Sequence, residues 1–291
     1  MQDSVTYLIA GHRLRVSGMQ EVSLLDSMPG FPLFVDASAT DGQWKVAFGQ
    51  EVLRPEQWTL LYEYTGPEGS PWCFARTDEA CYFMMQHTEP GIAPLLMRYD
   101  GGDTVVATHA FSPSVMRFAL WMATGMLAAA YKMVLIHSSV VVHHGRAVLV
   151  LGESGTGKST HTRLWMSHIP DTHLLNDDSP AVVIENGVPM VYGSPWSGKT
   201  HCYHTACFPL AAAVRLSQAP HNHIRRLGTL EAFTALEPSF PPALMRDERL
   251  TDKFIPTIGD IISSVPVFHL ECLPDADAAQ TSCAAIFGTL S

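Results

Sequence analysis

The chain has 291 residues, of which 47% are apolar and 16% charged, so it can bury the core of one large domain or two ordinary ones. Its net charge of −10 argues against nucleic acid as the main partner. The six cysteines form no C-x-x-C pair, which favours reduced thiols in a cytoplasmic protein. We expect no signal peptide, because the N-terminus, Met1-Gln2-Asp3-Ser4, lacks a basic region and a long apolar core. We expect no membrane partner, because the most apolar stretch, 118–131, is too short to span a bilayer.

The first 110 residues are expected to form a β-rich domain. Many short segments alternate apolar and polar residues, as half-buried antiparallel strands do. The expected strands are 4–10, 12–17, 31–35, 43–48, 58–64, 72–76, 81–86, 94–99 and 104–108. This half offers no catalytic constellation, and we interpret its tryptophans and methionines as core residues.

A buried helix is predicted over 112–132. Ser112 is a typical N-cap, and Pro113 suits the first helical position. The segment is apolar on nearly every side, which indicates a helix inside the core. We therefore place the domain boundary near residue 110, with 111–291 as the second domain.

A glycine-rich loop between a predicted strand, 146–151, and a predicted helix, 158–168, is the central motif. It fits the P-loop pattern G-x-x-x-x-G-K-[ST] in the strand–loop–helix context that the pattern requires. Its backbone N–H groups and the helix N-terminus favour phosphate. Lys158 can reach the β- and γ-phosphates, and the Ser159 hydroxyl can ligate Mg²⁺. The residues expected to bind the nucleotide are Gly152, Glu153, Ser154, Gly155, Thr156, Gly157, Lys158, Ser159 and Thr160.

An acidic pair ends the next predicted strand, 173–178, which closes in Asn176-Asp177-Asp178. A phosphoryl-transfer site needs one carboxylate for the metal and one to accept the proton of the attacking hydroxyl. Because adjacent side chains on a strand point to opposite faces, Asp177 and Asp178 cannot have equal roles.

His137 lies in a segment, 133–143, that is predicted to be one strand. His144-Gly145 would turn this strand into the strand of the P-loop. Pairing across that hairpin could bring His137 towards the phosphate site. A single histidine in a strand is as often a structural group, so this pattern alone leaves both interpretations open.

A second match to the P-loop pattern, Gly193 to Thr200, is not interpreted as a nucleotide site, because Pro195 removes an N–H and no helix follows. The loop 193–206 is either a flexible lid over the nucleotide or acceptor, or a connection without a role. Lys199 within it is a candidate for contacting a phosphate or an anionic substrate. The spacing of its His and Cys residues fits no common zinc site.

The rest of the chain alternates expected strands at 181–185, 188–192, 210–216 and 265–270 with expected helices at 229–236, 247–262 and 275–287. Arg225 and Arg226 fall at what is expected to be a helix start. One of them could neutralise transferred charge, and the other interpretation is a pair of solvated arginines.

Over roughly residues 130–270 the chain resembles the C-terminal domain of HPr kinase/phosphorylase and, more distantly, ATP-dependent phosphoenolpyruvate carboxykinase. The resemblance lies in His137, in Gly152 to Ser159 with the acidic Glu153 in second position, and in Asp177-Asp178. It implies an α/β (α+β) fold with a P-loop phosphotransferase core, and ATP and Mg²⁺ as cofactors. It also implies that Asp177 is the general base, that Asp178 assists Ser159 at the metal, and that His137 and Lys158 belong to the catalytic set.

The chain departs from those families in two respects. The glycine-rich Glu-Arg signature of HPr kinases is absent from the sequence, and 194–199 occupies about its place; the β-rich N-terminal half also differs. HPr itself is therefore not implied as the substrate. The resemblance implies a cytoplasmic Mg-ATP-dependent kinase acting on a hydroxyl, most simply serine, of a protein, peptide or small molecule.

Two alternatives come from other functional classes. A carboxykinase-like enzyme would need cationic side chains to bind a dicarboxylate, and the only candidates are Lys199, Arg225 and Arg226. A non-catalytic nucleotide sensor is disfavoured by the intact Asp177-Asp178 pair. The sequence leaves open the phosphate acceptor, ATP versus GTP, the role of the N-terminal domain and whether the chain forms a homo-oligomer.

Overall fold

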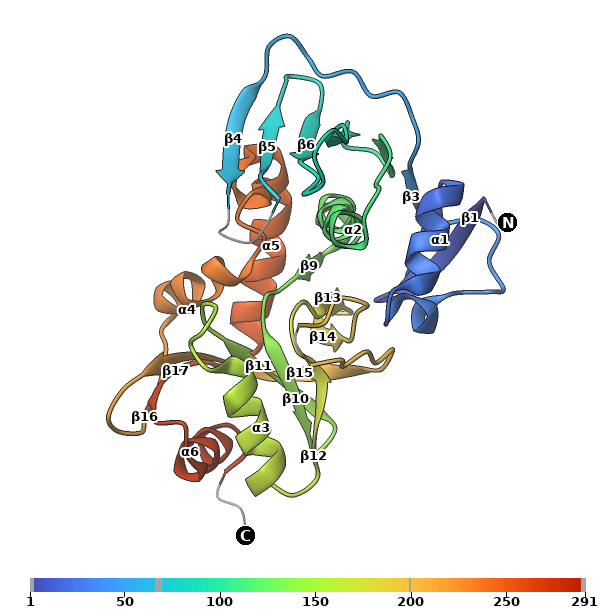
Figure 1. Ribbon diagram of the computed structural model, residues 1–291. Helices are drawn as coiled ribbons and strands as arrows, with labels where there is room; N and C mark the ends of the chain where they lie inside the picture. The colour runs from blue at the N-terminus through green and yellow to red at the C-terminus, as the bar shows by residue number, and fades with distance from the viewer. Residues whose placement is uncertain (1–2, 66–69, 199, 289–291) are drawn as a thin grey trace. The chain divides into compact units, whose positions relative to one another are not determined.

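The computed structural model describes residues 3–65, 70–198 and 200–288 of a mixed α/β protein (Figure 1). The chain forms two compact units, each built from two segments. The first comprises Met1–Tyr131 and Pro242–Lys253, and the second comprises Lys132–Pro241 and Phe254–Ser291. No helix among the described residues has the length and apolar character needed to cross a bilayer.

The first unit contains an eight-stranded sheet in the order β1-β2-β3-β8-β7-β6-β5-β4. The strands are β1 Ser4–Ile9, β2 His12–Ser17, β3 Trp44–Ala47, β4 Thr59–Tyr64, β5 Trp72–Arg76, β6 Cys81–Met85, β7 Leu95–Tyr99 and β8 Thr104–Ala107. The sheet is mixed, because β3 runs parallel to both β2 and β8. The β-rich character predicted for this half is confirmed.

Two segments of the first unit differ from the predicted strands. Residues 31–35 were expected to be a strand, but Phe31–Phe34 is a short 3₁₀ helix whose two phenylalanines are both buried. Side chains three residues apart lie on the same side of a 3₁₀ helix, which allows both rings to enter the core. Helix α1, Met19–Ser27, was not predicted; it buries the apolar side chains of Val22 and Leu25.

Helix α2, Pro113–Ala128, confirms the predicted buried helix, since 11 of its 16 residues are buried and Ser112 caps it by accepting a hydrogen bond from the Val115 amide. The helix contacts α1, β3 and β8 and so belongs to the first unit. The chain therefore divides after Tyr131 and not near residue 110, because the buried helix completes the N-terminal core.

The second unit is built on a nine-stranded sheet that runs β12-β10-β11-β15-β14-β13-β9, with β17 beside β15 and β16 beside β17. Its strands are β9 Met133–Leu135, β10 Ser139–His143, β11 Arg146–Leu151, β12 Thr172–Asn176, β13 Ala181–Glu185, β14 Val188–Tyr192, β15 Cys207–Gln218, β16 His223–Arg226 and β17 Val267–Cys272. Strands β11, β15 and β17 are parallel neighbours, so their carboxyl ends meet at one edge. That edge is where open α/β sheets bind ligands.

Helices α3, Lys158–His168, and α6, Ala276–Phe287, pack against each other in the second unit. A buried cluster that includes Trp165, Val148 and Cys283 joins both helices to the sheet. The other helices are α4, Thr229–Leu236, and α5, Glu248–Ser264, whose first six residues belong to the first unit. Strand β11 and helix α3 coincide with the predicted 146–151 and 158–168, so the loop between them begins and ends where the sequence indicates.

Two predictions for the second unit are wrong. The single strand expected over 133–143 is broken: β9 pairs with β13, whereas β10 pairs with β11 and β12. His137 lies in the break. The helix start expected at Arg225 and Arg226 is instead strand β16, which pairs antiparallel with β17 and places Ile224 against the core.

Candidate functional site

The glycine-rich loop leaves the buried end of β11 and enters α3 through backbone conformations that favour glycine. Gly152, Gly155 and Gly157 have φ values of +152°, +83° and +113°. L side chains rarely adopt such values, so these three positions require the residue that the pattern supplies. Gly157 is the N-cap of α3, and the free amides of the first helical turn therefore follow the loop directly.

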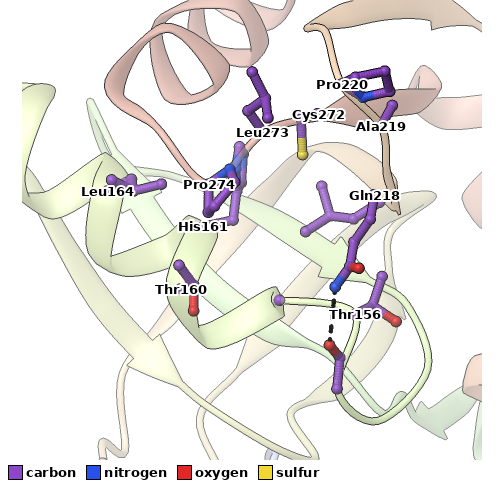
Figure 2. A pocket seen from close by; sticks show the side chains of 13 residues that line it. Thr156, Thr160, His161, Leu164, Gln218, Ala219, Pro220, Cys272, Leu273 and Pro274 are labelled. Atoms are coloured by element: carbon purple, nitrogen blue, oxygen red, sulfur yellow. Dashed lines mark hydrogen bonds between the residues drawn. The ribbon is translucent and has the colours of Figure 1, made fainter.

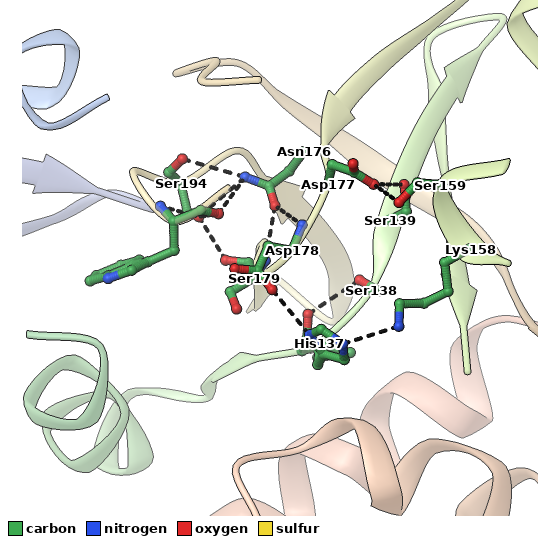
Figure 3. A network of polar contacts seen from close by, with 12 residues as sticks. His137, Ser138, Ser139, Lys158, Ser159, Asn176, Asp177, Asp178, Ser179 and Ser194 are labelled. Carbon is green, nitrogen blue, oxygen red and sulfur yellow. Dashed lines mark hydrogen bonds and ion pairs between the residues drawn. The ribbon is translucent and has the colours of Figure 1, made fainter. Parts of the chain in front are cut away.

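Lys158 extends back over the loop. Its Nζ atom donates to the carbonyl oxygens of Gly152, at 2.8 Å, and Glu153, at 3.3 Å. A third contact joins Nζ to Nε2 of His137 at 3.0 Å (Figure 3). Burial lowers the pKa of Lys158, while the charges of Asp178 and Asp177 act in the opposite direction. The lysine thus connects the loop to the acidic pair.

Asp177 faces the loop and the start of α3. It is 8% exposed, and its Oδ1 atom accepts hydrogen bonds from Oγ of Ser159, at 2.9 Å, and Oγ of Ser139, at 2.6 Å. Ser139 on β10 also contacts Thr162 of α3. The hydroxyl of Ser159, in the first turn of α3, therefore lies against the first carboxylate of the pair.

Asp178 faces the break between β9 and β10. Its Oδ1 atom lies 3.1 Å from Nδ1 of His137. Because an ammonium group only donates, Nε2 of His137 must accept the hydrogen bond from Lys158, and Nδ1 then carries the proton that it donates to Asp178. The result is a directed chain from Lys158 through a neutral imidazole to a carboxylate.

Asn176 holds the turn that separates the two carboxylates. Its side chain is fully buried, and Oδ1 accepts from the amides of Asp178 and Ser179, each at 3.0 Å. Its Nδ2 group donates to backbone and hydroxyl oxygens of Ser194 and to the carbonyl of Trp196. No role was predicted for Asn176 or Ser139, although an Asn directly before the acidic pair is a turn signal.

The segment 193–198 is anchored to the acidic pair. Ser194, Trp196 and Ser197 are buried, and a Cβ atom on Gly198 would lie 2.7 Å from the carbonyl oxygen of Asp177. The start of the loop 193–206 therefore lies beside the acidic pair. Lys199 lies outside the described residues, and no group of three His, Cys, Asp or Glu in the described part of the chain could hold a metal.

The two predicted arginines lie on β16, which is separated from β11 by β17 and β15. Arg225 pairs with Glu231 at 2.8 Å, and Arg226 is exposed on the same strand. A cation that the sequence did not indicate, Arg215, lies on β15 directly beside Leu151 in the parallel register, and its Nη2 atom is 3.7 Å from Oε1 of Glu153. No local signal marks Arg215, because its position depends on pairing between strands about 60 residues apart.

Comparisons with known proteins leave the family open. No family model matches the chain, and no curated protein is similar to it by sequence. Among solved structures, the HPr(Ser) kinase/phosphatase from Coxiella burnetii is similar over 51% of this chain and 90% of that chain, with 13% identity and a TM-score of 0.29. A TM-score this low carries no argument, so the function rests on the geometry of the site.

Proposed function

We propose that the protein is an Mg-ATP-dependent kinase that transfers the γ-phosphoryl group to a hydroxyl, most simply a serine, of a protein, peptide or small molecule. One observation carries the proposal: Asp177 contacts the P-loop serine, whereas Asp178 is joined through His137 to the P-loop lysine. A triphosphate bound at the loop would have Asp177 on the side where Mg²⁺ binds. It would have the His137–Asp178 pair, acting as a base, on the side from which the acceptor hydroxyl approaches.

Ser159 and Asp177 would hold the Mg²⁺ ion. Both offer hard oxygen donors, which Mg²⁺ prefers, and their hydrogen bond of 2.9 Å brings these donors to one point. When bound, the ion would supply positive charge that neutralises phosphate oxygens. This assignment exchanges the roles that the family resemblance implies, because Asp177 and not Asp178 lies at the serine.

His137 and Asp178 would act together as the base. An anion on the loop would attract Lys158, and Nε2 of His137 would then lose its donor and could accept the proton of the acceptor hydroxyl. The hydroxyl oxygen bonds to the γ-phosphorus as the bond to the bridging oxygen breaks, leaving the nucleoside diphosphate. Asp178 keeps the imidazole in the required tautomer and stabilises its charge after proton transfer.

Titration calorimetry with Mg-ATP tests the phosphate site. We expect Lys158→Gln to weaken binding at least about tenfold, because it removes a charge-assisted contact worth on the order of 1.5–3 kcal/mol. Lys132→Gln is the matched control, since the exposed Lys132 ammonium pairs with Asp260. Equal affinities for wild type and Lys158→Gln would contradict the proposal.

The carboxykinase-like alternative gains no support from the described cations. Arg225 is paired with Glu231, and Arg215 lies beside Glu153, so a dicarboxylate would have to displace an existing acidic partner at either one. We retain the kinase as the proposed function.

A further inference from the structure

A second feature of the ligand-binding edge is a cavity of about 600 Å³ beside the glycine-rich loop (Figure 2). Gly155, Thr156 and Gly157 of the loop form one side of it. Helix α3 and the ends of β15 and β17 form the others. The loop forms both the proposed phosphate site and one wall of the cavity. A single ligand can therefore extend from the phosphate site directly into the cavity.

The walls of the cavity suit an uncharged ligand. The cavity is lined by two prolines and by the leucines Leu164, Leu216 and Leu273. None of its 13 lining residues, which all belong to the described part of the chain, is Asp, Glu, Lys or Arg. Pockets of about 300–1,000 Å³ with mostly apolar walls are typical of small-ligand sites. Phosphate groups would find no cation here, whereas a flat heteroaromatic ring would find apolar contact.

His161 is a fixed, neutral part of the wall. Nε2 of His161 accepts a hydrogen bond from the Trp165 indole at 3.1 Å, and the same indole donates to Ser282 at 2.9 Å. Burial lowers the pKa of His161 to about 4. The imidazole therefore adds no charge to the cavity at neutral pH.

Gln218 supplies a polar group at the rim next to the loop. Its Nε2 atom donates to the carbonyl oxygen of Gly155 at 3.4 Å, and the side chain is otherwise exposed (Figure 2). An amide offers both a donor and an acceptor, which is what the edge of a nucleobase or the hydroxyls of a sugar require.

We propose that this cavity holds the base and sugar of the nucleotide whose phosphates bind at the glycine-rich loop. The proposal rests on the proposed function for the phosphates and adds where, and by which residues, the nucleoside is bound. The apolar side chains of α3, β15 and the segment after β17 contact the base, and Gln218 contacts a polar edge of the base or sugar.

The test compares Mg-ATP with Mg-tripolyphosphate, which has the phosphates without the nucleoside. We expect the wild type to bind ATP at least about tenfold more tightly than tripolyphosphate. Ala219→Trp places a large side chain in the cavity and should weaken ATP binding at least about tenfold while leaving tripolyphosphate within about twofold. Ala285→Trp, at an exposed position of α6 outside the cavity, is the matched control and should change neither affinity.

Tripolyphosphate binding also reports whether the variant is folded. If Ala219→Trp lowers the melting temperature strongly, Leu273→Trp on another wall replaces it, since Leu273 is 39% exposed. Equal wild-type affinity for the two ligands, or an unchanged ATP affinity in both variants, would overturn the cavity proposal and leave the phosphate site intact. A wild type that binds neither ligand would instead contradict the phosphate site on which the proposal depends.

Discussion

Nζ of Lys158 lies 3.0 Å from Nε2 of His137, which joins the cation of the glycine-rich loop to a histidine 21 residues earlier in the chain. The contact exists because β9 and β10 pair with different strands, and the break between them turns His137 out of the sheet. The backbone amide of His137 donates to Ser239, which fixes the break. The position of one side chain at the site therefore depends on how two strands are distributed over the sheet.

The His137–Asp178 pair should matter for turnover more than for binding. We expect Asp178→Asn to reduce the rate of phosphoryl transfer by roughly 10²–10⁴, the range for losing a general base, and to leave Mg-ATP affinity within a few-fold. His137→Ala should have a comparable effect on the rate. The measurement is release of the nucleoside diphosphate in the presence of the acceptor, with affinity followed by calorimetry.

Asp171→Asn is the matched control for this prediction. Asp171 is exposed and has a φ of +53°, which Asn tolerates, so the exchange removes a carboxylate without straining the turn. A wild-type rate in Asp178→Asn would show that Asp178 is not part of the general base. Asp177 would then be the candidate for that role.

Asp177 and Ser159 should determine the response to Mg²⁺. We expect Asp177→Asn and Ser159→Ala to weaken nucleotide binding about tenfold or more when Mg²⁺ is present, because each removes an oxygen ligand of the ion. With Mg²⁺ chelated, both variants should bind the nucleotide about as the wild type does. A titration of Mg²⁺ against nucleotide affinity separates the two conditions, and an equal loss with and without Mg²⁺ would contradict the metal assignment.

The residues of the candidate site were largely predictable from local sequence, whereas their geometry was not. Gly152 to Ser159 between a strand and a helix, and the Asp177-Asp178 pair after an apolar strand, are patterns of adjacent residues, and both lie where they were expected. Adjacent side chains on a strand were expected to point to opposite faces, but which carboxylate faces the loop could not be predicted from local sequence. The direction of the two side chains depends on Asn176, which holds the turn between them. Its Nδ2 group donates to the carbonyl oxygens of Ser194 and Trp196, and these contacts form only because the fold brings segment 194–196 against the acidic pair.

Long-range pairing explains the other differences. Arg215 reaches the loop because β15 is the parallel neighbour of β11, and the cavity exists because β15 and β17 end beside the loop. The helix start expected at Arg225 and Arg226 is wrong because the four residues of β16 show no local apolar period, although its partner β17 falls close to the strand expected at 265–270. Sequence patterns describe single elements well, and the order of strands in a sheet is a property of the whole unit.

Asn176 should be important for stability. Its fully buried side chain accepts from two amides and donates to Ser194 and Trp196, so Asn176→Ala leaves several buried polar groups without partners. Since each such group costs about 1–3 kcal/mol, we expect the free energy of unfolding to fall by roughly 2–5 kcal/mol in urea denaturation. Gln280→Ala at an exposed position of α6 is the control and should change it by less than about 0.5 kcal/mol. A similarly small change in Asn176→Ala would show that the turn holds without its side-chain bonds.

The stability of the protein should depend on pH through His161. Burial lowers the pKa of this imidazole from 6.5 to about 4 in the folded state, so between these values the unfolded chain binds more protons at this residue than the folded one. Its contribution to stability is therefore fully present above about pH 6.5 and is lost as the pH falls towards 4, by on the order of 3 kcal/mol. The physical cause is that a charged imidazole could not accept the hydrogen bond from Trp165 and would be desolvated.

Urea unfolding at several pH values between 7 and 4 measures how the free energy of unfolding changes with pH. This pH dependence should be weaker in His161→Gln than in the wild type. It should be unchanged in His168→Gln, which alters an exposed histidine on the same helix. Identical slopes in wild type and His161→Gln would mean that the imidazole does not remain neutral inside the fold.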